Sequence, residues 1–190
     1  DANGSNWRAV IDSLRPATQE LWLGLPVAEK RYFKQHLSRY WNVARHRMPA
    51  EAAAILDEMQ SKGSLEILKG RLKSITSGND GGFDIKFTTI GVEHSVGSDV
   101  LVNCIGSEAN FARIDSEFVK NLIARRNIRP DELAMGIDAT PDGRVIDKND
   151  KPSEVVRTMG TALKGILWES TAIPEIRTQA RDLALKLLEV

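Results

Sequence analysis

Apolar side chains in the first third of the chain recur every three or four residues, which is the spacing of an amphipathic helix. The first such stripe consists of Trp7, Val10, Ile11 and Leu14. Three further helical patterns follow, and each opens at a proline, a residue best tolerated in a first helical turn. These prolines are Pro16, Pro26 and Pro49. Because Gly63 stands where a helix C-cap is expected, we predict a helical lobe over residues 1–63.

Beyond this lobe the apolar period falls to two residues, which predicts β-strands. Segments 65–75 and 82–91 alternate in this way, and the Gly-, Asn- and Asp-rich stretch between them predicts a hairpin turn. A third strand is predicted over residues 98–106, where the apolar run from Val100 to Ile105 is typical of a strand buried on both faces.

The remaining segments predict short alternating elements. Residues 115–127 form an amphipathic helical pattern whose inward residues are Phe118, Leu122 and Ile123. A second hairpin is predicted over residues 135–152, with turn chemistry at Pro141, Asp142 and Gly143. The pattern then predicts a strand over residues 155–160, a loop or short helix over residues 161–170, and a last helix that opens at Pro174. The expected fold class is mixed α/β, with residues 64–190 forming an α/β portion after the helical lobe.

Composition narrows the class of protein. Of the 190 residues, 42% are apolar and 27% are charged, which is ordinary for a globular protein. Lys and Arg number 26, as do Asp and Glu, so no net charge attracts nucleic acid or an anionic membrane. The single cysteine, Cys104, cannot form an internal disulfide, and no Cys/His spacing resembles a zinc site. We expect a cytoplasmic protein with no metal, nucleic-acid or membrane partner.

The amino terminus shows no signal peptide, because DANGSNW lacks both a basic and an apolar region. It also lacks a methionine, as expected of a domain cut from a longer protein.

The first candidate site lies at the end of the helical lobe. Arg45, His46 and Arg47 are adjacent bases, suited to anion recognition by the two arginines beside a titrating histidine. A solvated helix face explains the same residues equally simply and is the more common outcome.

The second candidate is the end of the apolar run, at Asn103 and Gly106. A glycine after a buried strand lets a ligand approach the backbone, although a turn alone also requires glycine. Cys104 is expected to be a buried, inert thiol. The dinucleotide fingerprint G-x-G-x-x-G occurs nowhere, so this polypeptide by itself lacks the loop that holds a pyrophosphate.

The third candidate is the approach to the last helix. First-turn amides after Pro174 suit an electron-rich ligand atom, or Glu175 as an internal dipole partner. Gly160 and Gly165, followed by Trp168 and Glu169, give a flexible approach lined by an aromatic side chain. A binding-site edge and simple packing at a helix start both fit this pattern.

Three segments in this order resemble the carboxyl-terminal part of a bacterial family of FAD- and NAD(P)-binding proteins. They are WRAVIDSLRPATQELWLGLPVAEKRYFKQHLSRYWNVARHRM, VLVNCIGSE and PDGRVIDKNDKPSEVVRTMGTALKGILWESTAIPEIRTQA. The family members are flavoproteins predicted to be flavin-dependent oxidoreductases, distantly similar to flavin monooxygenases, and many are functionally uncharacterised.

The resemblance implies a split Rossmann-like fold whose amino-terminal half, with the FAD fingerprint, is missing from this chain. It implies cofactor-binding roles for the strand ends and for the start of the last helix. The residues concerned are Asn103, Gly106, Gly160, Gly165, Trp168, Glu169 and Pro174. Related flavoproteins often have Gly-Asp where this chain has Gly160 and Thr161, so this chain lacks the aspartate that contacts the ribityl chain in those proteins.

The function implied is hydride transfer from a nicotinamide to FAD, followed by oxidation of an unknown small-molecule substrate. FAD and NAD(P) are expected for the full-length protein, whereas the isolated chain is expected to be inactive and need not bind either. The alternative is a non-enzymatic protein-interaction or substrate-recognition domain. An exposed apolar stripe containing Trp22, Phe33 and Trp41 would favour that alternative.

Overall fold

The computed structural model describes residues 6–78, 81–147 and 149–188. The chain divides into two compact units. The larger unit combines Asp1–Arg47 with Ser107–Val190, and the smaller unit is Met48–Gly106. This grouping differs from the predicted division after residue 63. The change of apolar period marks where strands begin, but it does not reveal that the first helices share a core with the carboxyl-terminal segment.

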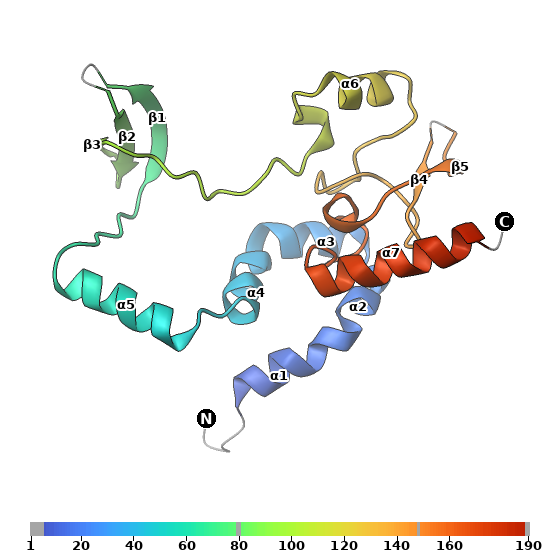
Figure 1. Cartoon of the computed structure of the whole chain (residues 1–190), viewed down its shortest axis with the longest axis horizontal. Coiled ribbons are helices and arrows are strands. Elements are labelled where there is room, and N and C mark those ends of the chain that lie inside the picture. The colour runs from blue at the N-terminus through green and yellow to red at the C-terminus, as the bar shows by residue number, and fades with distance from the viewer. Residues whose placement is uncertain (1–5, 79–80, 148, 189–190) are drawn as a thin grey trace. The chain divides into compact units, whose positions relative to one another are not determined.

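The first part of the larger unit is helical (Figure 1). Its elements are α1 (Trp7–Leu14), the 3₁₀ turn η1 (Arg15–Ala17), α2 (Thr18–Gly24), α3 (Val27–Tyr32), the π-helical segment η2 (Phe33–Leu37) and α4 (Ser38–Arg45). The side chain of Asn6 caps α1 by accepting the backbone N–H of Arg8 at 3.1 Å. Pro16 lies in η1 and Pro26 directly precedes α3, so the helices predicted after these prolines are confirmed.

The second part of the larger unit contains mostly short elements. They are η3 (Phe111–Arg113), α6 (Glu117–Ala124), β4 (Arg144–Ile146), β5 (Pro152–Arg157), η4 (Gly160–Leu163) and α7 (Ile173–Leu188). Strands β4 and β5 pair antiparallel. The predicted turn at Pro141–Gly143 is confirmed, since the N–H of Gly143 donates to Thr140 at 2.9 Å and an antiparallel bridge joins Ala139 to Val145. The predicted last helix is also confirmed, with Pro174 in its first turn.

The core of the larger unit consists of three apolar clusters. The buried residues are Trp22, Leu133, Met135 and Trp168 in the first, Ile128, Ile137 and Val145 in the second, and Ala139, Leu163 and Leu167 in the third. Helix α6 packs on the second cluster through Val119, Leu122 and Ile123. The prediction that Phe118 faces inward was wrong: the side chain is 72% exposed, because the inward stripe runs from residue 119 at helical spacing.

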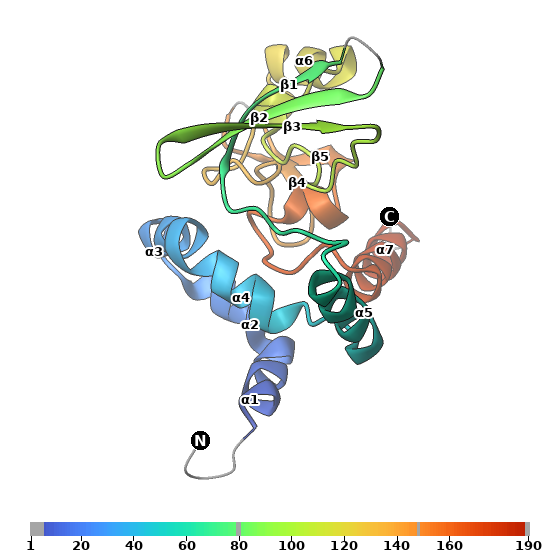
Figure 2. The same ribbon diagram turned by 90° about the vertical axis from the view of Figure 1, so that its left-hand side faces the viewer.

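The smaller unit contains one helix and one sheet (Figure 2). These are α5 (Ala50–Ser61) and the strands β1 (Arg71–Ser77), β2 (Phe83–Thr89) and β3 (Val92–Ser98), which form an antiparallel sheet in sequence order. Gly63 ends α5 in the left-handed region with φ +70°, and the next N–H, that of Ser64, donates back to Met59 at 3.0 Å. The predicted helix end is confirmed. The predicted first hairpin is confirmed as the pair of β1 and β2, although its first strand begins at Arg71 and not at residue 65.

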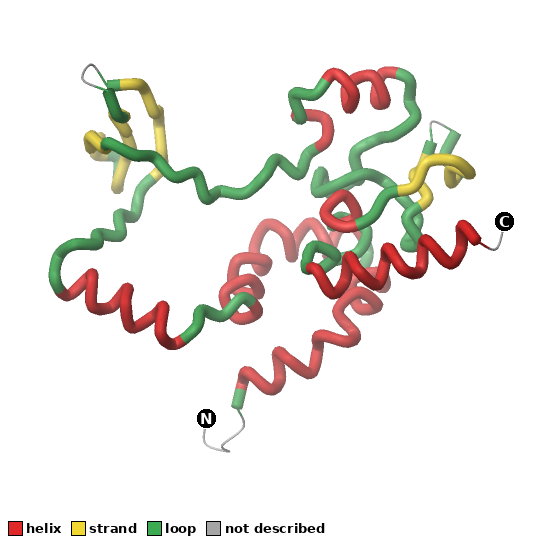
Figure 3. Tube along the Cα trace, viewed as in Figure 1, coloured by secondary structure: helices red, strands yellow, loops and turns green. Residues whose placement is uncertain are grey.

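The third strand lies earlier in the chain than predicted. A two-residue turn at Ile90 and Gly91, both with positive φ, connects β2 to β3 and sets their register. Residues 99–106 consequently follow the sheet as a loop (Figure 3). The prediction of a strand buried on both faces was wrong for this chain: Val100, Val102 and Ile105 are 71%, 75% and 91% exposed.

Cys104 is exposed as well, so the expectation of a buried thiol was also wrong. The strand signal in this segment comes from its apolar side chains, but they have no covering layer among the described residues. The mixed helix and sheet class is confirmed, with 44% of residues helical, 18% in strands, and both sheets small and antiparallel. Among the described residues, no helix has both the length and the apolar character required to cross a membrane.

Gly165 is essential to packing in the larger unit. A Cβ at this position would lie 2.4 Å from the carboxyl carbon of Asp131, which is buried. The Asp131 carboxylate cannot easily move, because it accepts hydrogen bonds from the backbone N–H groups of Leu133 and Met135 at 2.7 and 3.0 Å. We therefore expect Gly165→Ala to lower the free energy of unfolding by about 1–3 kcal/mol, measured by urea denaturation.

Gly24 provides the matched control for this substitution. It ends α2, and a Cβ there meets nothing within 4 Å, so Gly24→Ala should change the unfolding free energy by no more than about 0.5 kcal/mol. Equal effects of the two substitutions would contradict the packing role of Gly165.

Candidate functional site

Tryptophan side chains join the first helices to the segment before α7, across long sequence separations. The indole Nε1 of Trp22 on α2 donates to the carbonyl oxygen of Gly165 at 3.0 Å. The indole Nε1 of Trp41 on α4 donates to Glu169 Oε1 at 2.6 Å. These bonds connect the first helices to the approach to the last helix, two regions that are far apart in the sequence.

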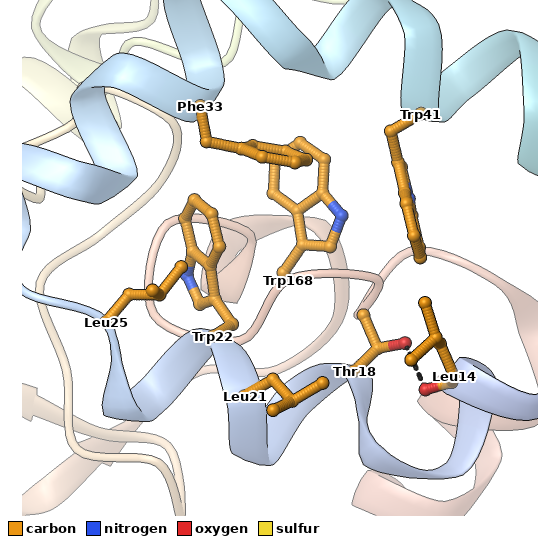
Figure 4. Close-up of a pocket in the computed structure, with 8 residues that line it drawn as sticks. All are labelled: Leu14, Thr18, Leu21, Trp22, Leu25, Phe33, Trp41 and Trp168. Atoms are coloured by element: carbon orange, nitrogen blue, oxygen red, sulfur yellow. Dashed lines mark hydrogen bonds between the residues drawn. The ribbon is translucent and has the colours of Figure 1, made fainter. Parts of the chain in front are cut away.

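A hollow lies between α2, α4 and this approach (Figure 4). Eight residues line it and define what we call the tryptophan hollow: Leu14, Thr18, Leu21, Trp22, Leu25, Phe33, Trp41 and Trp168. Its volume is about 120 Å³. The rings of Trp22 and Trp168 lie 4.9 Å apart with a tilt of 33°, and Phe33 meets the Trp168 ring edge-on at 5.2 Å. Such edge-on and tilted pairs are the preferred aromatic geometries, so the walls are well packed.

Glu169 lies beside the hollow and is held from two sides. Its Oε1 accepts from Trp41, and its Oε2 lies 3.2 Å from the Nε of Arg45, with both charged side chains only 14–15% exposed. The backbone of Glu169 has φ +66°, an uncommon conformation for a residue other than glycine. Such a conformation persists when surrounding contacts impose it, as the two contacts to the Glu169 carboxylate do here.

The three predicted anion-binding bases lie in different environments. Arg45 pairs with Glu169, whereas Arg47 donates to Asp12 Oδ1 at 2.6 Å. That hydrogen bond lowers the pKa of Asp12 and raises the pKa of Arg47. His46 is exposed and its Nδ1 lies 3.2 Å from the carbonyl oxygen of Asn42. Both guanidinium groups therefore already have a carboxylate partner, and anion binding by these residues stays a prediction.

The predicted residues near α7 are drawn together by hydrogen bonds. Gly160 has φ +70°; its N–H donates to Gln179 Oε1 at 2.7 Å, and its carbonyl accepts from the Ser170 hydroxyl at 3.0 Å. The bond to Gln179 attaches the turn after β5 to α7, and the bond from Ser170 attaches the same turn to the segment before that helix. Trp168 and Glu169 lie just before that helix, and Pro174 lies in its first turn. The space beside Gly165 is filled by the carboxylate of Asp131.

A polar cleft follows the first turns of α7. We call it the α7 cleft; its volume is about 400 Å³, and it is lined by Arg15, Pro16, Thr18, Gln19, Pro141, Leu167, Glu169, Pro174, Glu175, Thr178, Gln179 and Asp182. Arg15 lies 3.6 Å from Glu175 Oε1. Two buried polar atoms of the cleft, Glu175 Oε2 and Gln179 Nε2, make no hydrogen bond within the described structure. One is an acceptor and the other a donor, and both lie beneath the surface of the cleft because neither is accessible to solvent.

Asn103 and Gly106 belong to the smaller unit and are described apart from this site. Asn103 Oδ1 accepts the backbone N–H of Ile105 at 3.1 Å, and Gly106 has φ +86° with open space where a Cβ would lie. Among the residues that the structure describes, no group of three or more His, Cys, Asp or Glu side chains could hold a metal ion.

Sequence reasoning missed several contributors to the site. The sequence pattern places Trp22 and Trp41 in an exposed stripe, yet Trp22 is buried and Trp41 packs against the cluster that contains it. No sequence pattern marks Ser170, which is fully buried, or Asp131, which is also buried. The available signal was the recurrence of aromatic side chains along these helices, but it does not reveal which segment supplies the opposing ring.

Searches of protein-family models, curated proteins and solved structures found no match to this chain.

The ion pair of Arg45 and Glu169 should stabilise the larger unit more than a surface pair does. A double-mutant cycle of Arg45→Met and Glu169→Gln is expected to give a coupling free energy of about 1–2 kcal/mol, measured by urea denaturation, because both side chains are largely shielded from water.

The surface pair of Arg31 and Glu132 is the matched control. Its side chains are 60% and 68% exposed, so the corresponding cycle should give no more than about 0.5 kcal/mol. Equal coupling in the two cycles would contradict the anchoring role of Glu169.

A second charged cluster surrounds Asp142, in the turn before β4. Its Oδ2 lies 3.4–3.6 Å from nitrogen atoms of Arg144, Arg157 and Lys186, which come from β4, β5 and α7. Despite partial burial, the hydrogen bond from Thr140 and the charges of Lys186 and Arg144 lower the pKa of Asp142. The carboxylate thus connects the hairpin to the last helix.

The lowered pKa predicts a pH dependence of stability. The contribution of Asp142 should be fully present above its unfolded pKa of about 3.9 and be lost as the pH falls through its lower folded pKa. We expect Asp142→Asn to cost roughly 0.5–1 kcal/mol at pH 7 and less in strong acid, measured as unfolding free energy against pH. Asp115→Asn, at a 93% exposed side chain, is the control and should change stability little. A pH-independent cost of Asp142→Asn would contradict the assignment.

Proposed function

We propose that this chain is the carboxyl-terminal portion of a flavin-dependent oxidoreductase, which transfers hydride from a nicotinamide to FAD and then oxidises a small-molecule substrate. The observation that carries the proposal is the uncovered apolar run of residues 100–105. The segment resemblance described above supplies the identity of the cofactors. The proposed fold is a split Rossmann-like fold completed by an amino-terminal half that carries the G-x-G-x-x-G unit.

The apolar run has the composition of a central strand and the exposure of a loop. Val100, Val102 and Ile105 are each more than 70% exposed, in a segment that directly follows β3. Apolar surface gains roughly 25 cal/mol per Å² on burial, and runs of this kind normally lie in sheets covered on both faces. Strands and helices from a further polypeptide segment would supply that cover, and Asn103 and Gly106 would then lie at a strand end.

The α7 cleft is the part of this chain whose residues fit a flavin ring. A volume of about 400 Å³ is within the usual range for ligand pockets, and the lining includes the polar or charged side chains of Arg15, Glu175 and Gln179. When bound, FAD would supply the hydride acceptor. The first-turn amides of α7 would then stabilise negative charge on the reduced ring, while Gly160 and Pro174 fix where that turn begins.

The alternative function, an interaction or substrate-recognition domain, was favoured only if Trp22, Phe33 and Trp41 formed an exposed apolar stripe. Trp22 is buried, and Phe33 and Trp41 are half-buried against it, so these residues form no exposed stripe. The proposed compartment is the cytoplasm, since an exposed lone thiol at Cys104 suits reducing conditions.

Cofactor binding tests the proposal. The 190-residue chain and the product of the longer reading frame that encodes it are each purified with FAD, and the flavin retained per protein is measured by visible absorbance. We expect stoichiometric FAD on the longer product and none held tightly by the chain alone, because the pyrophosphate loop lies outside it. Substituting Gln179→Leu in the longer product should weaken FAD binding, whereas Arg177→Leu, at an exposed position of α7 outside the cleft, should not.

Two results would contradict the proposed function. One is tight, stoichiometric yellow binding by the isolated 190 residues. The other is a stop codon directly upstream of Asp1 in the encoding gene, in place of a reading frame with a strand followed by G-x-G-x-x-G.

A further inference from the structure

We propose that a second cleft along α7 is a binding site for a small carboxylate with an apolar body. We call it the Lys186 cleft; Asp142, in the turn before β4, lines one side, and Asp182 and Lys186 of α7 line the other. Its volume is about 320 Å³, within the usual range for ligand pockets. It adjoins the α7 cleft, with which it shares Pro141, Gln179 and Asp182. The site consists of residues of this chain alone and needs no flavin.

Apolar side chains form one wall of the Lys186 cleft. Leu163 of η4 is buried at its base, and Leu183 of α7 is half-buried. Met159, 42% exposed, and Pro141 also line the cleft. Such a wall removes the apolar body of a ligand from water, which is the main source of affinity for small ligands. The charges beside the wall then decide which head group the ligand carries.

The charged side chains around Asp142 leave a surplus of positive charge. Lys186, Arg144 and Arg157 approach a single oxygen, Oδ2 of Asp142, at 3.4, 3.6 and 3.5 Å. Charge-assisted hydrogen bonds between such groups are normally about 2.7–2.9 Å long. Arg144 Nε and Arg157 Nη1 are buried and make no hydrogen bond within the described structure. One carboxylate therefore does not neutralise these three cations.

The other carboxylates near the cleft do not cancel this surplus. Glu154 lies 3.5 Å from Arg144 Nη1, but its side chain is 83% exposed, so water and salt screen its charge. Asp182 has its own cation, because its Oδ1 accepts two N–H groups of Arg181 at 3.0 and 2.8 Å. Among the described residues this group contains four cationic side chains and three carboxylates, which favours an anionic ligand over a cationic one.

Lys186 is the cation that a ligand can reach. Its side chain is 46% exposed, and its ammonium group has three N–H donors but only Asp142 as a partner in the part of the chain that is described. The buried guanidinium atoms of Arg144 and Arg157 are inaccessible, so they act on a ligand through their charge alone. A ligand carboxylate would accept from Lys186 while its apolar body lies against Leu183.

The test compares phenylacetate, phenylacetamide and 2-phenylethylamine, which share an apolar body and differ in the charge of the head group. Binding to the 190-residue chain is measured by ligand-observed NMR and by shifts in ¹H–¹⁵N spectra. We expect phenylacetate to bind roughly 3- to 10-fold more tightly than phenylacetamide, and the amine to bind most weakly, because Lys186 donates to a charged acceptor. Raising NaCl from about 0.05 M to about 0.5 M should reduce that preference, since salt screens the charges.

Two substitutions that remove a positive charge from α7 form a matched pair. Lys186→Met should abolish the preference for phenylacetate over phenylacetamide, whereas Arg177→Met, at an exposed position outside the cleft, should leave both affinities unchanged. A second pair tests the apolar wall. Met159→Gln should weaken binding of both probes roughly 2- to 5-fold, and Val155→Gln, at an 89% exposed position outside the cleft, should not.

Equal affinity for phenylacetate and phenylacetamide, or tightest binding of the amine, would overturn the preference for a carboxylate. Absence of saturable binding up to the solubility limit, or equal effects of Lys186→Met and Arg177→Met, would overturn the site. FAD retention by the longer product is a separate measurement, so failure of this site can be told apart from failure of the proposed function.

Discussion

The larger unit depends on the attachment of one short segment, residues 165–170, to the first helices. Trp168 packs its ring against Trp22, while Glu169 holds Trp41 and Arg45 from α4. The hydrogen bonds involved join residues 128 and 143 positions apart. Because buried polar groups must find partners, each of these bonds also fixes where the neighbouring ring can lie. Without this attachment, the chain would lose the common core of its two ends.

The same segment shapes the tryptophan hollow and the α7 cleft. The ring of Trp168 forms a wall of the tryptophan hollow, and the following residue, Glu169, lines the α7 cleft. The left-handed backbone of Glu169 turns the chain between them. The buried hydroxyl of Ser170 donates to the carbonyl oxygen of Gly160, and the N–H of Gly160 donates to Gln179 on α7. Together these two bonds attach the segment to that helix. An apolar hollow and a polar cleft are thus adjacent and share one wall.

The two units bury their apolar side chains to different extents. The larger unit has three buried clusters, whereas the smaller unit consists of one helix, a three-stranded sheet and an exposed apolar run. A two- or three-stranded sheet needs a covered apolar face for independent stability. The exposed apolar run of residues 100–105 is the basis of the oxidoreductase proposal.

The sequence by itself determined the local elements of this protein. Proline positions located the helices, Gly63 ended α5, the period of two located β1 and β2, and Pro141 to Gly143 set a turn, because each of these signals acts over a few residues. Only the tertiary structure decided which segments share a core. The Ile90–Gly91 turn assigned the third strand to residues 92–98 and left 100–105 uncovered, and Trp22 became buried because Trp168, far along the chain, covers it. Such pairings depend on contacts between distant residues, and local periodicity carries no information about them.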